Sequence, residues 1–82
     1  MKLETKDLIM QMVTTWNQFN CAKRVDVEFD ESEFSKGHWA INLELKGVVN
    51  SDFVMFLLPT LVCQNCIWFL SECGGRVVFH IQ

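Results

Sequence analysis

Hydrophobic residues recur along residues 5–20 at the three- and four-residue spacing of one helical face. The members of this face are Leu8, Ile9, Met12, Val13, Trp16 and Phe19. Polar residues occupy the other side, Thr5 is a suitable N-cap, and Asn20 can end the helix. The pattern therefore predicts an amphipathic helix over residues 5–20.

Strict alternation of apolar and polar residues follows in two segments, residues 24–30 and 39–46. Alternation with a period of two is typical of strands with one buried face. A polar connection that ends at Gly37 separates the two segments. They are therefore expected to form an antiparallel hairpin.

Residues 53–70 carry no charge, and Asn50 or Ser51 can cap a helix that begins there. Pro59 is expected either to kink this helix or to divide it in two. Gly74 and Gly75 are interpreted as its C-terminal stop. Residues 76–81 alternate again and predict a last strand.

The predicted fold class is α+β, with the order αββαβ in a single domain over residues 1–82. Both helices are expected on one face of a three-stranded sheet. A helical connection would make the second and third strands parallel. The arrangement resembles a ferredoxin-like fold that lacks its first strand, a likeness that implies no activity.

The uncharged segment has the length of a short membrane span. Its internal polar residues and acidic flanks, Asp52 and Glu72, argue against a membrane location. On an unbroken helix, its least apolar stripe would face away from the sheet. This stripe comprises Phe53, Leu57, Thr60, Gln64, Trp68 and Ser71. Four of these, Phe53, Leu57, Gln64 and Trp68, are predicted to bind a protein partner; the alternative is that the first helix covers them.

Four cysteines are present, and the charged N-terminus lacks the apolar core of a signal peptide. Reduced thiols in a cytoplasmic protein are therefore expected, with Cys21, Cys63, Cys66 and Cys73 interpreted as core residues. The alternatives are a redox pair at Cys63 and Cys66, or a zinc site formed by Cys63, Cys66 and Cys73 with Cys21 or His80 as the fourth ligand. No metal or cofactor is predicted.

Five carboxylates fall within eight residues without an intervening base, in a chain of net charge −3. They are Asp26, Glu28, Asp30, Glu31 and Glu33. The acidity argues against direct nucleic-acid binding. These residues are candidates for binding a basic protein, as an imitation of a phosphate row, or they simply keep the sheet face soluble.

No catalytic motif is recognised around His38 or His80, and no small-molecule substrate is identified. The predicted function is a non-enzymatic protein-interaction module that forms a homo-oligomer and regulates or inhibits another protein. The alternatives are an acidic mimic of nucleic acid that inhibits a nucleic-acid-binding protein, and a small zinc- or thiol-dependent domain.

Overall fold

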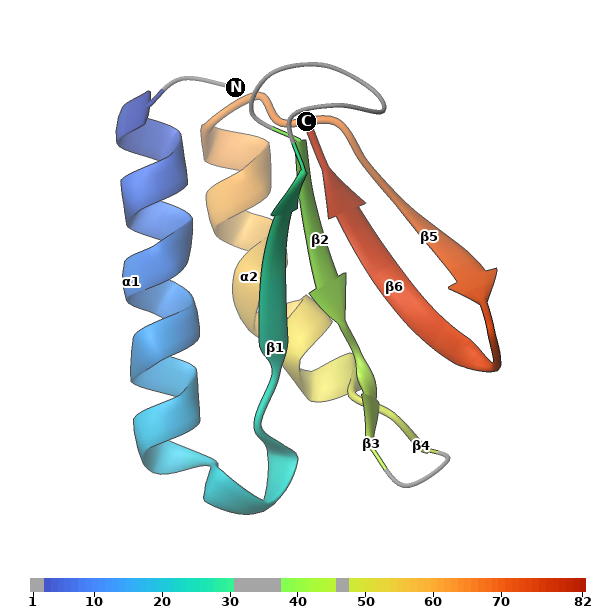
Figure 1. The fold of residues 1–82 in the computed structure, drawn as a ribbon. Coiled ribbons are helices and arrows are strands. Elements are labelled where there is room, and N and C mark those ends of the chain that lie inside the picture. The colour runs from blue at the N-terminus through green and yellow to red at the C-terminus, as the bar shows by residue number, and fades with distance from the viewer. Residues whose placement is uncertain (1–2, 31–37, 46–47) are drawn as a thin grey trace.

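The computed structural model describes residues 3–30, 38–45 and 48–82. Two α-helices, a short 3-10 helix and six strands follow one another along this part of the chain (Figure 1). Their bounds are α1 Leu3–Phe19, η1 Cys21–Lys23, β1 Asp26–Asp30, β2 His38–Asn42, β3 Glu44–Leu45, β4 Val48–Val49, α2 Ser51–Cys63, β5 Trp68–Cys73 and β6 Arg76–Ile81.

The main sheet has four strands in the order β1-β2-β6-β5, and each neighbouring pair is antiparallel. The predicted α+β class and the β1–β2 hairpin are confirmed. The expectations of three strands, and of a last strand parallel to β2, are wrong. After α2 the chain first forms β5 at the edge, then turns back so that β6 enters between β5 and β2. This reversal makes β6 antiparallel to β2.

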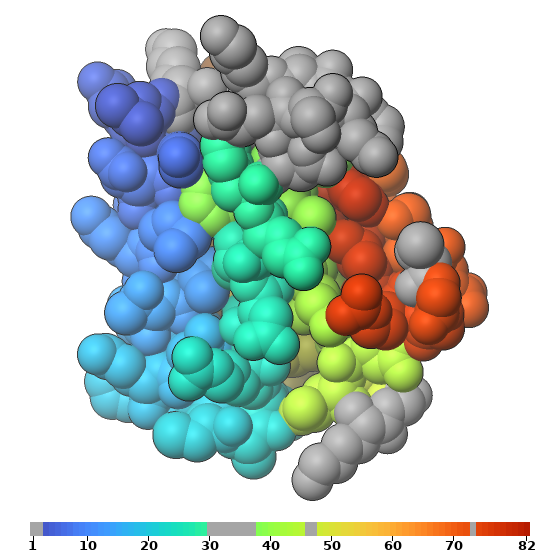
Figure 2. All heavy atoms as spheres, viewed as in Figure 1, coloured from blue at the N-terminus to red at the C-terminus, as the bar shows by residue number. Residues whose placement is uncertain are grey.

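Both helices contribute to one hydrophobic core on a single face of the sheet. Ile9, Val13 and Trp16 come from α1, and Phe53, Leu57 and Leu61 come from α2. They pack with sheet residues that include Trp39, Ile41, Phe79 and Ile81. Strands form the opposite face, and neither α1 nor α2 crosses it (Figure 2).

Helix α1 agrees with the prediction within two residues at its start and one at its end. Thr5, however, is not an N-cap, because it lies inside the helix and its buried hydroxyl donates to Oε1 of Gln64 at 3.0 Å. Phe19 is predicted to lie on the buried face of α1, but its side chain is exposed. The buried face of α1 therefore ends at Trp16, whose Nε1 donates to the carbonyl of Lys23 at 2.8 Å.

Residues 64–70 lie outside α2, so the prediction that they are helical is wrong. The helix continues through Pro59 and ends at Cys63. Asn65 follows in the left-handed conformation, with φ of 54°. Its N–H donates to the carbonyl of Val62 at 3.2 Å, and that of Cys66 donates to the carbonyl of Leu61 at 3.0 Å. These bonds form a Schellman motif, so Asn65 ends the helix that Gly74 was expected to end.

Gly74 and Gly75 instead form the two-residue turn of the β5–β6 hairpin, between the paired residues Cys73 and Arg76. Their φ values are 60° and 77°. Positive φ at both central positions is what a type I′ turn requires, and this turn matches the twist of the strands that it joins. Glycine adopts this geometry without steric cost.

Asn50 joins α2 to the chain that leaves α1. Its Oδ1 accepts from the N–H of Phe53, and its Nδ2 donates to the carbonyl of Lys23 at 2.8 Å. The residue is only 6% exposed. One side chain therefore caps a helix and satisfies a carbonyl from a distant segment.

Replacing Asn50 by alanine is expected to lower the free energy of unfolding by about 2 kcal/mol, because both bonds are lost. Asn50→Asp keeps the capping acceptor and should cost about half as much. The exposed neighbour Ser51 provides the control variant, Ser51→Ala. Urea denaturation measures all three, and equal stability of Asn50→Ala and Ser51→Ala would contradict the assigned role.

Candidate functional site

Strand β5 lies at one edge of the sheet and carries four consecutive exposed hydrophobic residues from the turn before it onward (Figure 1). The exposed fractions are 68% for Ile67, 40% for Trp68, 36% for Phe69 and 50% for Leu70. A contiguous exposed run of this kind is unusual in a chain that acts alone. The β5 edge, defined here as residues 67–72, is the candidate interaction surface.

The sheet register shows why Trp68 and Leu70 stay accessible. Trp68 is opposite Ile81, and Leu70 is opposite Phe79. Directly opposed residues share a face of the sheet, so both side chains lie on the face that the helices cover elsewhere. Ile81 and Phe79 are fully buried, whereas the residues on β5 are not. The helices therefore cover this face of the sheet as far as β6 and leave β5 uncovered.

Among the strands that the structure describes, none pairs with the outer side of β5. Ile67 and Gln82 exchange both N–H···O bonds, at 3.0 and 2.8 Å. Bonded and non-bonded pairs alternate along an antiparallel ladder. The N–H and C=O groups of Trp68, Leu70 and Glu72 consequently point away from β6, towards the free edge.

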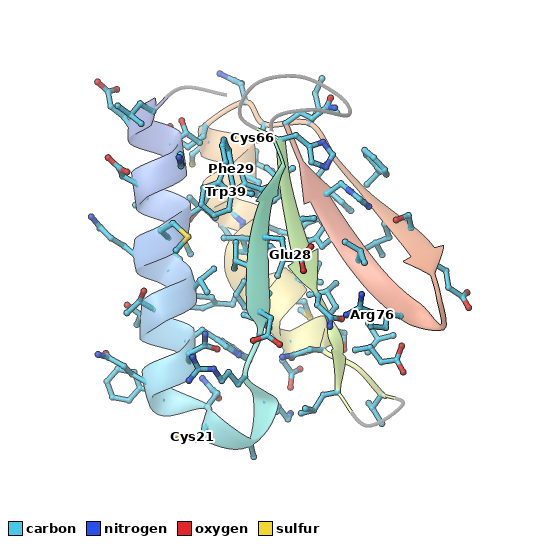
Figure 3. All side chains as sticks on the ribbon, viewed as in Figure 1. Cys21, Glu28, Phe29, Trp39, Cys66 and Arg76 are labelled. Carbon is cyan, nitrogen blue, oxygen red and sulfur yellow. The ribbon has the colours of Figure 1, made fainter. Side chains whose placement is uncertain are left out.

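The opposite edge of the sheet differs in chemistry. Strand β1 carries the exposed Asp26 and Glu28 on its outer face, and Asp30 ends the strand. Glu31 and Glu33, the other two predicted acidic residues, lie outside the described residues. Arg76 lines the same pocket of about 230 Å³ as Asp26, Glu28 and Asn42. Figure 3 labels Glu28 and Arg76. A cation within this acidic surface makes it less like a row of phosphates.

The predicted helical stripe does not exist as one surface. Phe53 and Leu57 are fully buried in the core, contrary to the expectation that they face outward. Gln64 follows α2 and accepts from Thr5, and Trp68 belongs to β5. The stripe fails because the Schellman motif ends the helix before Gln64. Trp68 remains in the candidate surface, where Leu70 and Ile67 join it.

The signal that would have identified this surface is the pair of glycines. Two glycines between two apolar segments are a typical hairpin sequence. Interpreted as a helix stop, the same glycines extend the predicted helix over β5. That helix does not place Ile67 and Leu70 on the predicted interaction stripe.

Cys21, Cys63 and Cys66 do not form a core cluster, and the side chain of Cys73 lies outside the part of the chain that the structure describes. Cys21 and Cys63 are exposed, contrary to prediction, and Cys66 is half-buried in the turn after α2. Burial raises the pKa of the Cys66 thiol. Among the residues that the structure describes, no three His, Cys, Asp or Glu side chains are grouped to hold a metal ion.

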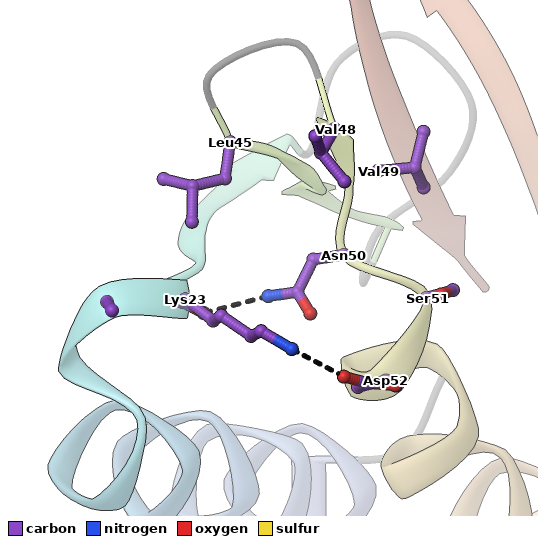
Figure 4. A pocket seen from close by; sticks show the side chains of 8 residues that line it. Lys23, Leu45, Val48, Val49, Asn50, Ser51 and Asp52 are labelled. Carbon is purple, nitrogen blue, oxygen red and sulfur yellow. Dashed lines mark hydrogen bonds and ion pairs between the residues drawn. The ribbon is translucent and has the colours of Figure 1, made fainter.

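A second concave surface lies where η1, the β3–β4 hairpin and the start of α2 meet (Figure 4). Its volume is about 430 Å³, and Leu45, Val48 and Val49 form much of its apolar lining. The polar groups here already interact with one another. Lys23 Nζ lies 2.7 Å from Oδ2 of Asp52, and both side chains are exposed. We therefore interpret this pocket as a consequence of how η1, the β3–β4 hairpin and α2 meet, and not as a binding site.

Comparison with protein-family models, with curated proteins and with solved structures found no match. Within residues 3–30, 38–45 and 48–82, neither helix has the length and apolar character needed to cross a membrane.

Thiol reactivity should follow the observed burial. Iodoacetamide at neutral pH is expected to alkylate Cys21 and Cys63 before Cys66, because the raised pKa lowers the thiolate fraction of Cys66 and burial limits access. Peptide mapping after short reaction times measures the order. In denaturant the three rates should converge. Alkylation of Cys66 as fast as Cys63 in the native protein would contradict the structure.

Proposed function

We propose that this protein is an interaction module that self-associates through the β5 edge, by antiparallel pairing with β5 of a second copy. The observation that carries the proposal is the combination of free backbone groups and exposed apolar side chains on one strand. When a strand is added to a sheet edge, the backbone hydrogen bonds provide affinity and the side-chain contacts provide specificity. A two-fold axis perpendicular to the sheet would join two four-stranded sheets into one.

The second copy is favoured as the partner because the strand complements itself. Pairing Trp68 with Leu70 of the second copy joins residues whose backbone groups both point off the edge. It also places their side chains on the same face, with Phe69 at the two-fold axis. Pairing Leu70 with Leu70 would instead oppose Trp68 to the charged Glu72. The first register covers more apolar surface and is the one proposed.

The two edges of the sheet support this choice. Natural proteins protect free edges with charges, proline or bulges. Strand β1 has acidic residues at alternate positions, which would repel a second β1. Strand β5 has the sequence WFLSEC, in which Glu72 is the one charged residue. The unprotected edge is therefore the one suited to pairing.

The energy of such a contact is appreciable. Complete burial of a large apolar side chain stabilises by about 1.5–3 kcal/mol. Leu70 is half exposed, so finishing its burial adds about 1 kcal/mol in each copy. Trp68 adds a similar gain on the same face, and the ladder satisfies backbone groups that water otherwise solvates.

A lysine at position 70 tests the proposal, because a charge on an edge strand opposes pairing. Sedimentation equilibrium over a wide concentration range is expected to show a dimer for the wild type and a monomer for Leu70→Lys. Leu70 is preferred to Trp68 for this test, since the Trp68 ring also packs 5.3 Å from that of Phe79.

Leu3→Lys is the matched control. It makes the same chemical change at a residue of α1 that is 70% exposed, and it should leave the dimer intact. Thermal melting confirms that each variant is folded. A wild type that stays monomeric at the highest concentration, or a Leu70→Lys variant that dimerises as the wild type does, would refute the proposal.

A further inference from the structure

Three side chains form a continuous hydrogen-bonded chain on the outer face of the sheet. Ser71 Oγ lies 2.6 Å from Nε2 of His80, and Nδ1 of His80 lies 2.8 Å from Nε2 of His38. They come from three neighbouring strands, β5, β6 and β2. His80 is central because its partners Phe69 and Ala40 in the ladder place Ser71 and His38 diagonally on either side.

The donors and acceptors in this chain can be arranged in either direction, and in one of the two arrangements Ser71 is the proton donor. A neutral imidazole has one N–H and one lone pair. When the hydroxyl of Ser71 donates to Nε2 of His80, the proton of His80 is on Nδ1 and donates to Nε2 of His38. A hydroxyl, an imidazole that accepts its proton, and a group that orients the imidazole make up the arrangement of an activated serine.

His80 is held in place and kept unprotonated. The ring of Phe69 stacks on it at 4.6 Å between centroids and 10° between planes. His38, which is 1% exposed, lies at the Nδ1 edge of the His80 ring. Burial, and then the repulsion between His80 and His38 when both are protonated, hold the pKa of His80 below its ordinary value. At neutral pH His80 is therefore in the form that accepts a proton.

We propose that Ser71 is a nucleophile that accepts acyl or phosphonyl groups from small activated esters, with His80 as its general base and His38 as a positioning residue. The site lies beside the partly exposed Phe69 ring, which favours small substrates with an aromatic leaving group. The activity does not require self-association, so the two proposals can fail independently.

The chemistry balances without a further reactant. In the reaction with an aryl ester, a bond forms between Ser71 Oγ and the carbonyl carbon, and the bond to the aryloxide oxygen breaks. His80 takes the hydroxyl proton and passes it to the departing aryloxide. Water then attacks the acylated serine, His80 takes a proton from that water, and the proton returns to Ser71 Oγ as the carboxylic acid leaves.

A fluorophosphonate provides the direct test, because it traps activated serines by forming the Oγ–P bond with loss of fluoride. Intact mass should show one adduct on the folded wild type, and peptide mapping should place it on Ser71. Ser51, exposed at the start of α2, is an internal reference that should stay unlabelled. Ser71→Ala should abolish the adduct, and Thr14→Ala, at an exposed hydroxyl of α1, should not.

The histidines are tested by rate. His80→Gln should slow labelling by about 100-fold, the contribution typical of a general base. For the wild type, the rate should fall as the pH drops through the lowered pKa of His80 and be constant above it. His38→Gln keeps an amide oxygen that can accept from Nδ1 of His80, so its labelling rate should stay near that of the wild type, whereas His38→Phe, which has no acceptor, should label more slowly. A merely structural role of His38 would slow labelling equally in both variants.

Each result decides the matter. Labelling of Ser71 with the expected pH profile supports the proposal, even if His38→Gln does not fold, because the wild-type profile and His80→Gln then carry the test. A folded wild type that gains no adduct, an adduct distributed equally over Ser51 and Ser71, or undiminished labelling of folded His80→Gln would overturn it.

Discussion

The antiparallel pairing of β5 with β6 determines the remainder of this structure. The Schellman motif at Asn65 ends α2, and the turn at Gly74 and Gly75 returns the chain along its own path. The returning strand, β6, inserts beside β2 and completes the core with Phe79 and Ile81. Strand β5, which precedes the turn, stays at the edge of the sheet. The core that the two helices form with the sheet does not extend over it.

The consequences on the two faces of the sheet are different. On the helix side, the pairing leaves Trp68 and Leu70 next to buried residues yet accessible, so an apolar surface ends at a free strand. On the outer side, the same register aligns Ser71 with His80 and His38. One hairpin therefore carries both the surface proposed for self-association and the side chains proposed for acyl transfer. Both would be lost if residues 64–70 were helical.

Much of the fold could be predicted from periodicity, because α1, the β1–β2 hairpin and β6 each bury one face. The structure of residues 64–70 could not be predicted in this way, because a continuous apolar run lacks the periodicity that distinguishes a helix from a strand. The deciding signals were local: an asparagine that adopts positive φ and a glycine pair that suits a hairpin turn. The Ser71–His80–His38 chain depends on the register of three strands, which no spacing in the sequence reveals.

Hydrogen exchange at the β5 edge tests the central claim most directly. The amides of Trp68 and Leu70 are expected to exchange slowly at high protein concentration and rapidly after dilution, because a second copy would protect them. The amides of β1, at the other edge, should exchange at the same rate under both conditions. Rapid exchange of Trp68 and Leu70 at every concentration would contradict the account, since the β5 edge would then have no partner strand.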